Sequence, residues 1–198
     1  MKEVVLATLN PGKIQEMTDI LRPFGITPRS LRDLPAIDSP RESGMTFLEN
    51  ATIKASYYSI ETSLPCVADD SGLEVDVLEG APGIYSSRFA REEASDDENV
   101  IRLIAVLGDK PRPWNARFVC SAAYAEAGRV IATYEGELLG EIIPEKRGAS
   151  GFGYDPVFFL KERGLTVAEL AAREKNRISH RRKAIEGLIR QLRELKIL

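Results

Sequence analysis

Two kinds of strand connection occur in this chain, and together they restrict the folds that it can adopt. Arg117–Ala125 is the strongest β signal, and the turn residues Glu126–Arg129 join it to Val130–Tyr134, which predicts an antiparallel hairpin. Near the N-terminus, the apolar run Val4–Ala7 is followed by a polar loop and an amphipathic helix, the order of a βα unit. We therefore predict an α/β fold with one mixed β-sheet flanked by helices.

Helices are predicted where apolar residues recur at spacings of three and four. The second helix covers Thr46–Ile60, and the capping-box pair Thr166 and Glu169 predicts a further short helix. Ile37–Met45 is predicted to be irregular, and Glu137–Pro144 to add another strand. The expected buried faces are Ile14, Met17, Leu21 and Phe24 in the first helix; Phe47, Ala51, Ala55 and Tyr58 in the second; Val100, Leu103, Ile104 and Leu107 in the third; and Ile185, Leu188, Ile189, Leu192 and Leu195 in the last.

The composition excludes several classes of protein. With 198 residues, 43% of them hydrophobic and 29% charged, the chain fits a soluble globular protein, which we assign to a single domain, 1–198, or to two lobes sharing a core. No apolar run approaches the ~20 residues that cross a bilayer, and the N-terminal strand leaves no room for a signal peptide, so we expect a cytoplasmic protein without a membrane partner. Cys66 and Cys120 lie in apolar runs and are expected to be free buried thiols. The net charge of −3 argues against a nucleic-acid polymer as partner.

The segment Pro65–Gly72 places two adjacent carboxylates, Asp69 and Asp70, directly after an apolar run. We interpret Cys66–Ala68 as the end of a buried strand and Leu73–Leu78 as a further extended segment. Adjacent carboxylates repel each other and are costly to desolvate, and a bound divalent cation would explain them. Oxygen ligands suit Mg²⁺, which is usually shared with substrate phosphates. A solvated turn is the alternative, because Asp, Ser and Gly are common turn residues.

The loop Thr8-Leu9-Asn10-Pro11-Gly12-Lys13 lies between a predicted strand and a predicted helix, where backbone N–H groups and the helix dipole favour an anion. Thr8 and Asn10 add polar side chains, and Gly12 permits close approach. The helix dipole alone disfavours Lys13. A phosphate would explain this lysine, whereas an ordinary βα turn with a surface lysine is the alternative.

A second polar set, Glu49, Asn50 and Lys54, occurs in the predicted helix Thr46–Ile60. Asn50 and Lys54 are four residues apart and therefore share one face of that helix. A solvated helix surface explains the set as long as it stands alone.

An aromatic residue between glycines marks the segment Ser150–Phe158. The glycines around Phe152 let its ring approach a flat ligand such as a nucleobase, and an aromatic plug of the core is the alternative. The basic run Lys175–Lys183 contains the only histidine, His180. Such a run is usually a solvated helix start, but positive charge there opposes the helix dipole unless an anion is bound. A nucleoside triphosphate with Mg²⁺ would satisfy all of these features together.

Six motifs follow one another along the chain in a highly specific order. They are Thr8-x-Asn10-x-x-Lys13, Phe47-x-Glu49-Asn50-Ala51, Ala68-Asp69-Asp70-Ser71-Gly72-Leu73, Gly80-Ala81-Pro82-Gly83-Ile84-Tyr85-Ser86, Phe152-Gly153-Tyr154-Asp155-Pro156 and Ser179-His180-Arg181. In this combination, which covers essentially the whole chain, the sequence resembles the inosine triphosphate pyrophosphatase family, and most of all its bacterial dITP/XTP pyrophosphatases.

The resemblance implies an elongated mixed sheet in two lobes with a central active-site cleft, usually in a homodimer. It also implies Mg²⁺-dependent hydrolysis of the non-canonical purine nucleoside triphosphates XTP, ITP and dITP to the monophosphate and pyrophosphate. That reaction clears deaminated purines from the nucleotide pool.

Site residues are also implied by the resemblance. Asp70 matches the catalytic, metal-associated acid of the family, with Asp69 beside it. Arg41 stands where many members have a metal-associated glutamate, so we expect the adjacent Glu42 to serve as a metal ligand, with Glu49 as another acid near the metal. The implied substrate-binding residues are Thr8, Leu9 (where members often have glycine), Asn10, Pro11, Gly12, Lys13, Ser71, Phe152, Gly153, Tyr154, Asp155, Lys175, His180 and Arg181.

Two other functions stay open at this point. The chain could be a Mg²⁺-dependent phosphohydrolase of another nucleotide or phosphate ester, which would release orthophosphate stepwise instead of pyrophosphate. It could also bind nucleotides without catalysis, although a binding module has little need of the adjacent acids Asp69 and Asp70.

Overall fold

The computed structural model of the protein describes residues 2–198. They form two compact units. The first unit consists of 2–71, Cys120–Gly136 and His180–Leu198, and the second of Gly72–Val119 and Glu137–Ser179.

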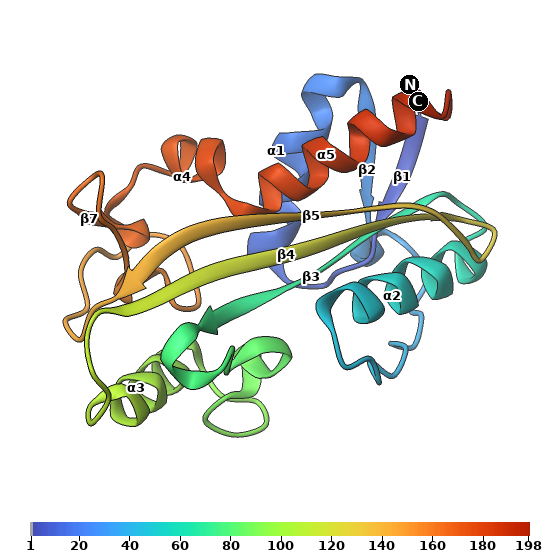
Figure 1. The fold of residues 1–198 in the computed structure, drawn as a ribbon. Helices are drawn as coiled ribbons and strands as arrows, with labels where there is room; N and C mark the ends of the chain where they lie inside the picture. Colours follow the sequence, from blue (N-terminus) through green and yellow to red (C-terminus); the bar gives the residue numbers. More distant parts are fainter. Residues whose placement is uncertain (1) are drawn as a thin grey trace. The chain divides into compact units, whose positions relative to one another are not determined.

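Seven strands form one sheet in the order β2-β1-β3-β4-β5-β6-β7. β1 runs parallel to β2 and β3, whereas β6 is antiparallel to both β5 and β7, which makes the sheet mixed, as predicted. The strands are β1 (Lys2–Leu6), β2 (Ile26–Ser30), β3 (Cys66–Val75), β4 (Trp114–Glu126), β5 (Arg129–Ile142), β6 (Phe158–Leu160) and β7 (Leu165–Thr166). The α-helices are α1 (Pro11–Leu21), α2 (Phe47–Glu61), α3 (Asp96–Leu107), α4 (Ala172–Ile178) and α5 (His180–Glu194) (Figure 1). Short 3₁₀ helices cover Arg22–Phe24, Leu31–Asp33, Asp76–Leu78, Gly83–Arg88, Asp155–Val157 and Val167–Glu169.

The strands of the first unit bury apolar residues on both faces. On β1, Val4 and Leu6 pack in one cluster with α1 and α5, whereas Val5 packs in another cluster with α2. On β3, Val67 belongs to the first cluster and Cys66 to the second. Because successive strand residues point to opposite faces, α1 and α5 cover one face of this part of the sheet and α2 covers the other (Figure 1).

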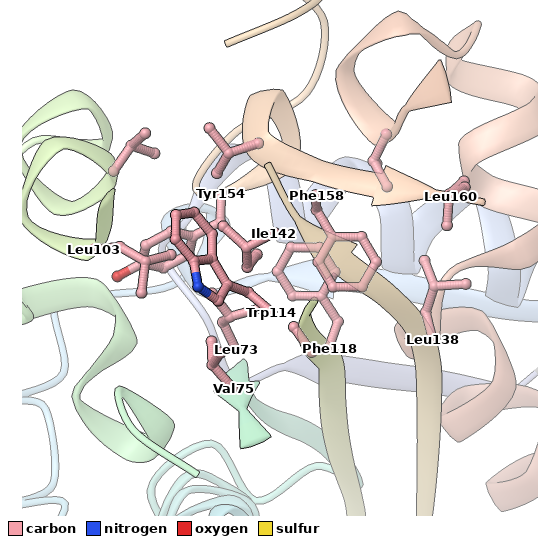
Figure 2. Packing of buried hydrophobic residues seen from close by; sticks show 14 of the residues in the cluster. Leu73, Val75, Leu103, Trp114, Phe118, Leu138, Ile142, Tyr154, Phe158 and Leu160 are labelled. Atoms are coloured by element: carbon pink, nitrogen blue, oxygen red, sulfur yellow. The ribbon is translucent and has the colours of Figure 1, made fainter. Parts of the chain in front are cut away.

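The second unit has a core of its own, in which aromatic side chains are prominent. Phe118 of β4 and Phe158 of β6 are stacked with ring centroids 4.3 Å apart, and Trp114 and Tyr154 lie in the same cluster (Figure 2). Leu103 adds the apolar face of α3. Because Tyr154 is part of this core, the core anchors the segment that also carries Phe152.

Several elements confirm the sequence predictions. α2 begins after the N-cap Thr46 and buries all four of its predicted face residues. β4 and β5 are neighbouring strands joined at Ala127 and Gly128, which gives the predicted hairpin. Thr166 and Glu169 make the predicted capping box, and both cysteines are free and buried.

The prediction that the strand ends at Ala68 was wrong. β3 continues through Asp69, Asp70, Ser71 and Gly72 to Val75, so the acids are neither at the end of a strand nor in a turn. Pairing within the sheet overrode the turn propensity of these residues, since strand preference depends mainly on packing and burial. Glu137 likewise belongs to the single long strand β5 and does not start another strand.

Other predictions failed at an edge strand of the sheet and at the C-terminal ends of two helices. β2 was not predicted, because Pro28 interrupts its pattern, and it is an edge strand, where proline is tolerated. α1 ends at Leu21, and Phe24 lies in the following 3₁₀ helix. Leu195 lies beyond the end of α5 and is exposed. Within residues 2–198, every helix is too short or too polar to span a bilayer.

Candidate active site

The two adjacent aspartates point to opposite faces of β3. Asp69 pairs with Lys13 of α1 and Arg181 of α5, the two helices that cover one face. Asp70 pairs with Lys54 of α2, which covers the other face. The alternation of a strand therefore separates the two carboxylates and gives each its own cations.

Asp69 is a buried anion held by two cations. Its Oδ2 atom lies 3.0 Å from Lys13 Nζ and 3.2 Å from Arg181 Nε. Burial raises the pKa of the carboxyl, but the charges of Lys13, Arg181 and Lys54 outweigh it, so that the pKa of Asp69 lies well below its usual range. Its Oδ1 atom is buried and has no hydrogen-bond partner among residues 2–198.

Asp70 has the opposite shift. Its Oδ1 atom lies 2.8 Å from Lys54 Nζ, and its Oδ2 atom receives only a long hydrogen bond of 3.4 Å from Asn50 Nδ2. Burial raises the pKa of Asp70 above its usual value, because Lys54 offsets only part of the desolvation. A carboxylate with a raised pKa and one weakly bonded oxygen is suited to accept a proton.

The alternative of a solvated helix surface on α2 does not hold at two positions. Asn50 and Lys54 are both buried. Lys54 Nζ lies between two acids, 2.8 Å from Asp70 Oδ1 and 3.0 Å from Glu42 Oε2. Burial lowers the pKa of Lys54, but Asp70, Asp69 and Glu42 outweigh it, so its pKa is raised and the ammonium stays charged at neutral pH. Glu49 instead lies in the first turn of α2, where it accepts a hydrogen bond from the Met45 N–H at 2.6 Å.

The loop Thr8–Lys13 contains the start of α1, which begins at Pro11. Asn10 is the N-cap, and its side chain accepts a hydrogen bond from the Lys13 N–H at 3.1 Å. Thr8 Oγ1 accepts one from the Asn10 N–H at 3.2 Å. The side chain of Leu9 is exposed. The positive charge of Lys13 in the first turn is balanced within the structure by Asp69, so no bound phosphate is needed to explain it.

Arg181 links three parts of the first unit. Its guanidinium is buried and donates from Nε to Asp69, from one terminal nitrogen to Glu16 of α1, and from the other to Ser71 Oγ at 2.9 Å. Glu16 was not predicted, and no local pattern could have revealed it, because its partner lies 165 positions away. His180 is buried at the first position of α5.

In the second unit, Asp155 gathers the other predicted substrate-binding residues. Its Oδ2 atom accepts from Lys175 Nζ at 2.7 Å and from the Phe152 N–H at 3.0 Å. Lys175 also lies over the Phe152 ring, 4.3 Å from its centroid. Gly151 has φ +83°, and a Cβ there would meet Asp155 Oδ2 at 2.0 Å, so only glycine permits this arrangement.

The remaining residues of this segment are held by the unit itself. The Tyr154 ring is buried in the core, and its hydroxyl donates to the Ser86 carbonyl at 2.8 Å. The Gly153 N–H donates to Asp96 Oδ2 of α3 at 2.7 Å. Any ligand contact of Tyr154 would therefore involve its backbone rather than its ring.

The donor set fits a hard cation that brings part of its own coordination shell. No group of three His, Cys, Asp or Glu side chains in residues 2–198 could hold a metal ion, because Asp69 faces away from Asp70. Asp70 and Glu42 do converge on Lys54, and both offer carboxylate oxygens. Mg²⁺ suits such a pair, since it usually takes one or two carboxylates and fills its remaining positions with water and phosphate oxygens.

Comparisons with known proteins give one consistent result. A dITP/XTP pyrophosphatase of Geobacillus kaustophilus is 46% identical over 196 residues, which are 98% of this chain and 96% of that relative. A relative of the same name in Escherichia coli is 45% identical over 197 residues, with 98% and 99% coverage. The structure of a HAM1 protein from Coxiella burnetii matches with a TM-score of 0.86 and 40% identity, over 98% of this chain and all of that one. The model of the Ham1 family matches residues 4–191, and the chain therefore belongs to the Ham1 family.

Proposed function

We propose that this chain hydrolyses XTP, ITP and dITP to the monophosphate and pyrophosphate, as one catalytic domain of residues 1–198 that forms a homodimer in the cytoplasm. Relatives named dITP/XTP pyrophosphatase, which match nearly the full chain, support the reaction. The observation that carries the proposal is the asymmetry of Asp70, whose Oδ1 atom is bound by Lys54 while its Oδ2 atom has only a 3.4 Å contact.

This asymmetry gives Asp70 the role of general base. Lys54 fixes the carboxylate through Oδ1, which leaves Oδ2 to take the proton of a water that attacks the α-phosphorus. A positioned base typically contributes ~10²–10⁴ in rate, and the rest of the catalysis comes from positioning and charge stabilisation.

We propose Mg²⁺ as the cofactor, with Asp70 and Glu42 as ligands and Asp69 as a nearby anion. When bound, the ion would screen the phosphate charges and orient the triphosphate. Lys54 would then balance the carboxylates around it, and Lys13 would face phosphate oxygens from the first turn of α1. Lys13 and Lys54, the N-terminal N–H groups of α1 and the hydroxyl of Ser71 would together form the proposed phosphate-binding site.

The purine is assigned to Phe152, Asp155 and Lys175 of the second unit. Hypoxanthine and xanthine carry a carbonyl at C6, where adenine carries an amino group. A donor such as Lys175 accommodates the carbonyl and leaves the amino group of adenine opposed, and unpaired buried groups of this kind can reject a substrate by ~10⁴. Because each nitrogen of Arg181 already donates within the first unit, we assign Arg181 to holding Asp69 and Ser71.

The test is a pyrophosphate-release assay with XTP, ITP, dITP, ATP and GTP, each with Mg²⁺ and with EDTA. We expect pyrophosphate and the monophosphate from the first three, little from ATP and GTP, and no turnover in EDTA. Because guanine shares the C6 carbonyl, its rejection would have to act through its 2-amino group. Stepwise release of orthophosphate would instead identify a different phosphohydrolase. Binding of ITP without any product would reduce the protein to a nucleotide-binding module.

A further inference from the structure

The C-terminal end of the polar segment 38–44 is hydrogen-bonded to the first turns of α2, the helix that follows it. The Gly44 N–H donates to Asn50 Oδ1 at 2.9 Å, and the following Met45 N–H donates to Glu49 Oε2 at 2.6 Å. Within this segment, Glu42 is held by Lys54 at 3.0 Å. α2 therefore contacts the segment and the residue that follows it at several points.

Asn50 contacts Asp70 as well as Gly44, and it therefore links the segment to β3. Its carboxamide is buried, and Nδ2 reaches Asp70 Oδ2 at 3.4 Å while Oδ1 holds Gly44. The two neighbours are of opposite kind, a donor N–H and an acceptor carboxylate, and only an amide offers an acceptor and a donor at this spacing. Aspartate could replace the first contact but not the second.

Gly44 is adapted to this contact. A Cβ at this position would lie 2.7 Å from Asn50 Oδ1 and 2.6 Å from Glu49 Cβ, so any larger residue would push the segment away from α2. Glycine at this position therefore lets the segment lie directly against Glu49 and Asn50.

We propose that Asn50 is a positioning residue for the reaction: it holds the segment that carries Glu42 and, with the same amide, orients Asp70. This inference rests on the proposed function, in which Glu42 and Asp70 are the carboxylates that receive the cation. Asn50 sets the distance between them because it is bonded to the backbone beside one and to the side chain of the other. It also accounts for the Glu49-Asn50 motif, for which substrate contact is not required.

Two substitutions separate the two contacts. Asn50→Asp keeps an acceptor for the Gly44 N–H but replaces the donor to Asp70 with a second negative charge. Asn50→Ala removes both contacts. Thr52→Ala is the matched control, since it removes a hydrogen bond to the Glu49 carbonyl on the same helix and touches neither Gly44 nor Asp70.

Hydrogen exchange of the Gly44 amide is measured without metal or nucleotide, together with the Mg²⁺ concentration for half-maximal XTP turnover, kcat and KM. For Asn50→Ala we expect exchange at least about tenfold faster and a half-saturating Mg²⁺ concentration about tenfold higher, because one hydrogen bond is lost. For Asn50→Asp we expect wild-type exchange but kcat lowered about tenfold or more, since a like charge faces Asp70.

The outcomes discriminate between the two proposals. If wild type turns over XTP and Asn50→Ala matches Thr52→Ala in both exchange and Mg²⁺ response, the positioning role is wrong while the proposed function stands. An Asn50→Asp variant with wild-type kcat would also overturn it. If the wild type releases no pyrophosphate, both proposals fail, whatever the exchange rates show.

Discussion

Each face of β3 carries one aspartate paired with cations, but the pKa values of the two aspartates are shifted in opposite directions. On the face covered by α1 and α5, Asp69 is fully enclosed and meets two cations, and its pKa is held below the usual range. On the face covered by α2, Asp70 shares a single ammonium with Glu42, and its pKa is raised. One carboxylate is thus held as an anion by its two cations, and its neighbour is the proposed base. The ratio of cations to acids, rather than burial alone, separates the two roles.

The largest expected effect comes from Asp69→Ala. Removing this carboxylate leaves Lys13 and Arg181 without their shared partner in a buried site, which should lower the free energy of unfolding by about 3–5 kcal/mol. Urea denaturation measures this loss, with Asp70→Asn as the control. Equal destabilisation by both variants would remove the distinction between the two faces.

Asp70→Asn should mainly affect catalysis. The amide cannot take a proton from water, so we expect XTP turnover to fall by ~10² or more, the usual cost of losing a general base. The unfolding midpoint should change little, because an amide oxygen can still accept the hydrogen bond from Lys54. Turnover close to that of the wild type would exclude Asp70 as the base.

A fall in pH should destabilise the protein through Asp69 and stabilise it through Asp70. Folding lowers the pKa of Asp69, so its stabilising contribution is present above the unfolded value near 3.8 and is lost as the pH falls toward the folded value. Folding raises the pKa of Asp70, so protonation of that group stabilises the protein as the pH falls through its folded value. Urea unfolding in EDTA between pH 3 and pH 7 should therefore show a shallower acid decline for Asp69→Asn than for the wild type. The decline should be steeper for Asp70→Asn, and the reverse order would mean that the assigned shifts are wrong.

The smallest effects should come from the helix caps. Asn10 caps α1 and Thr46 caps α2, each by accepting a backbone N–H, so Asn10→Ala and Thr46→Ala should each cost about 1 kcal/mol. Thermal unfolding measures the stability of each variant, and titration of XTP turnover with Mg²⁺ measures how each variant responds to the cation. Only Thr46→Ala should weaken the Mg²⁺ response, because α2 carries Lys54 and Asn50.

Much of the local structure could be predicted because its causes are local. The apolar face of α2 and the Thr166 capping box follow from spacings of a few residues. The path of β3 through Asp69 and Asp70 could not be predicted, since residues typical of turns are held extended by neighbouring strands that are distant in the chain. Glu16 was missed because its partner Arg181 is also distant in the chain. A charged residue next to an apolar stripe is usually solvated, so its burial could not be foreseen.

Residue types and their spacing were sufficient to predict the start of α2, the Thr166 capping box and the family to which the chain belongs. Tertiary structure alone decided which cation meets which acid: Arg181 reaches Asp69 across 112 positions, and Lys54 is buried between Asp70 and Glu42 instead of lying in solvent. The physical reason is that helix caps and periodicity act over a few residues, whereas the charge state of a carboxyl depends on every group that folding brings within a few ångströms of it.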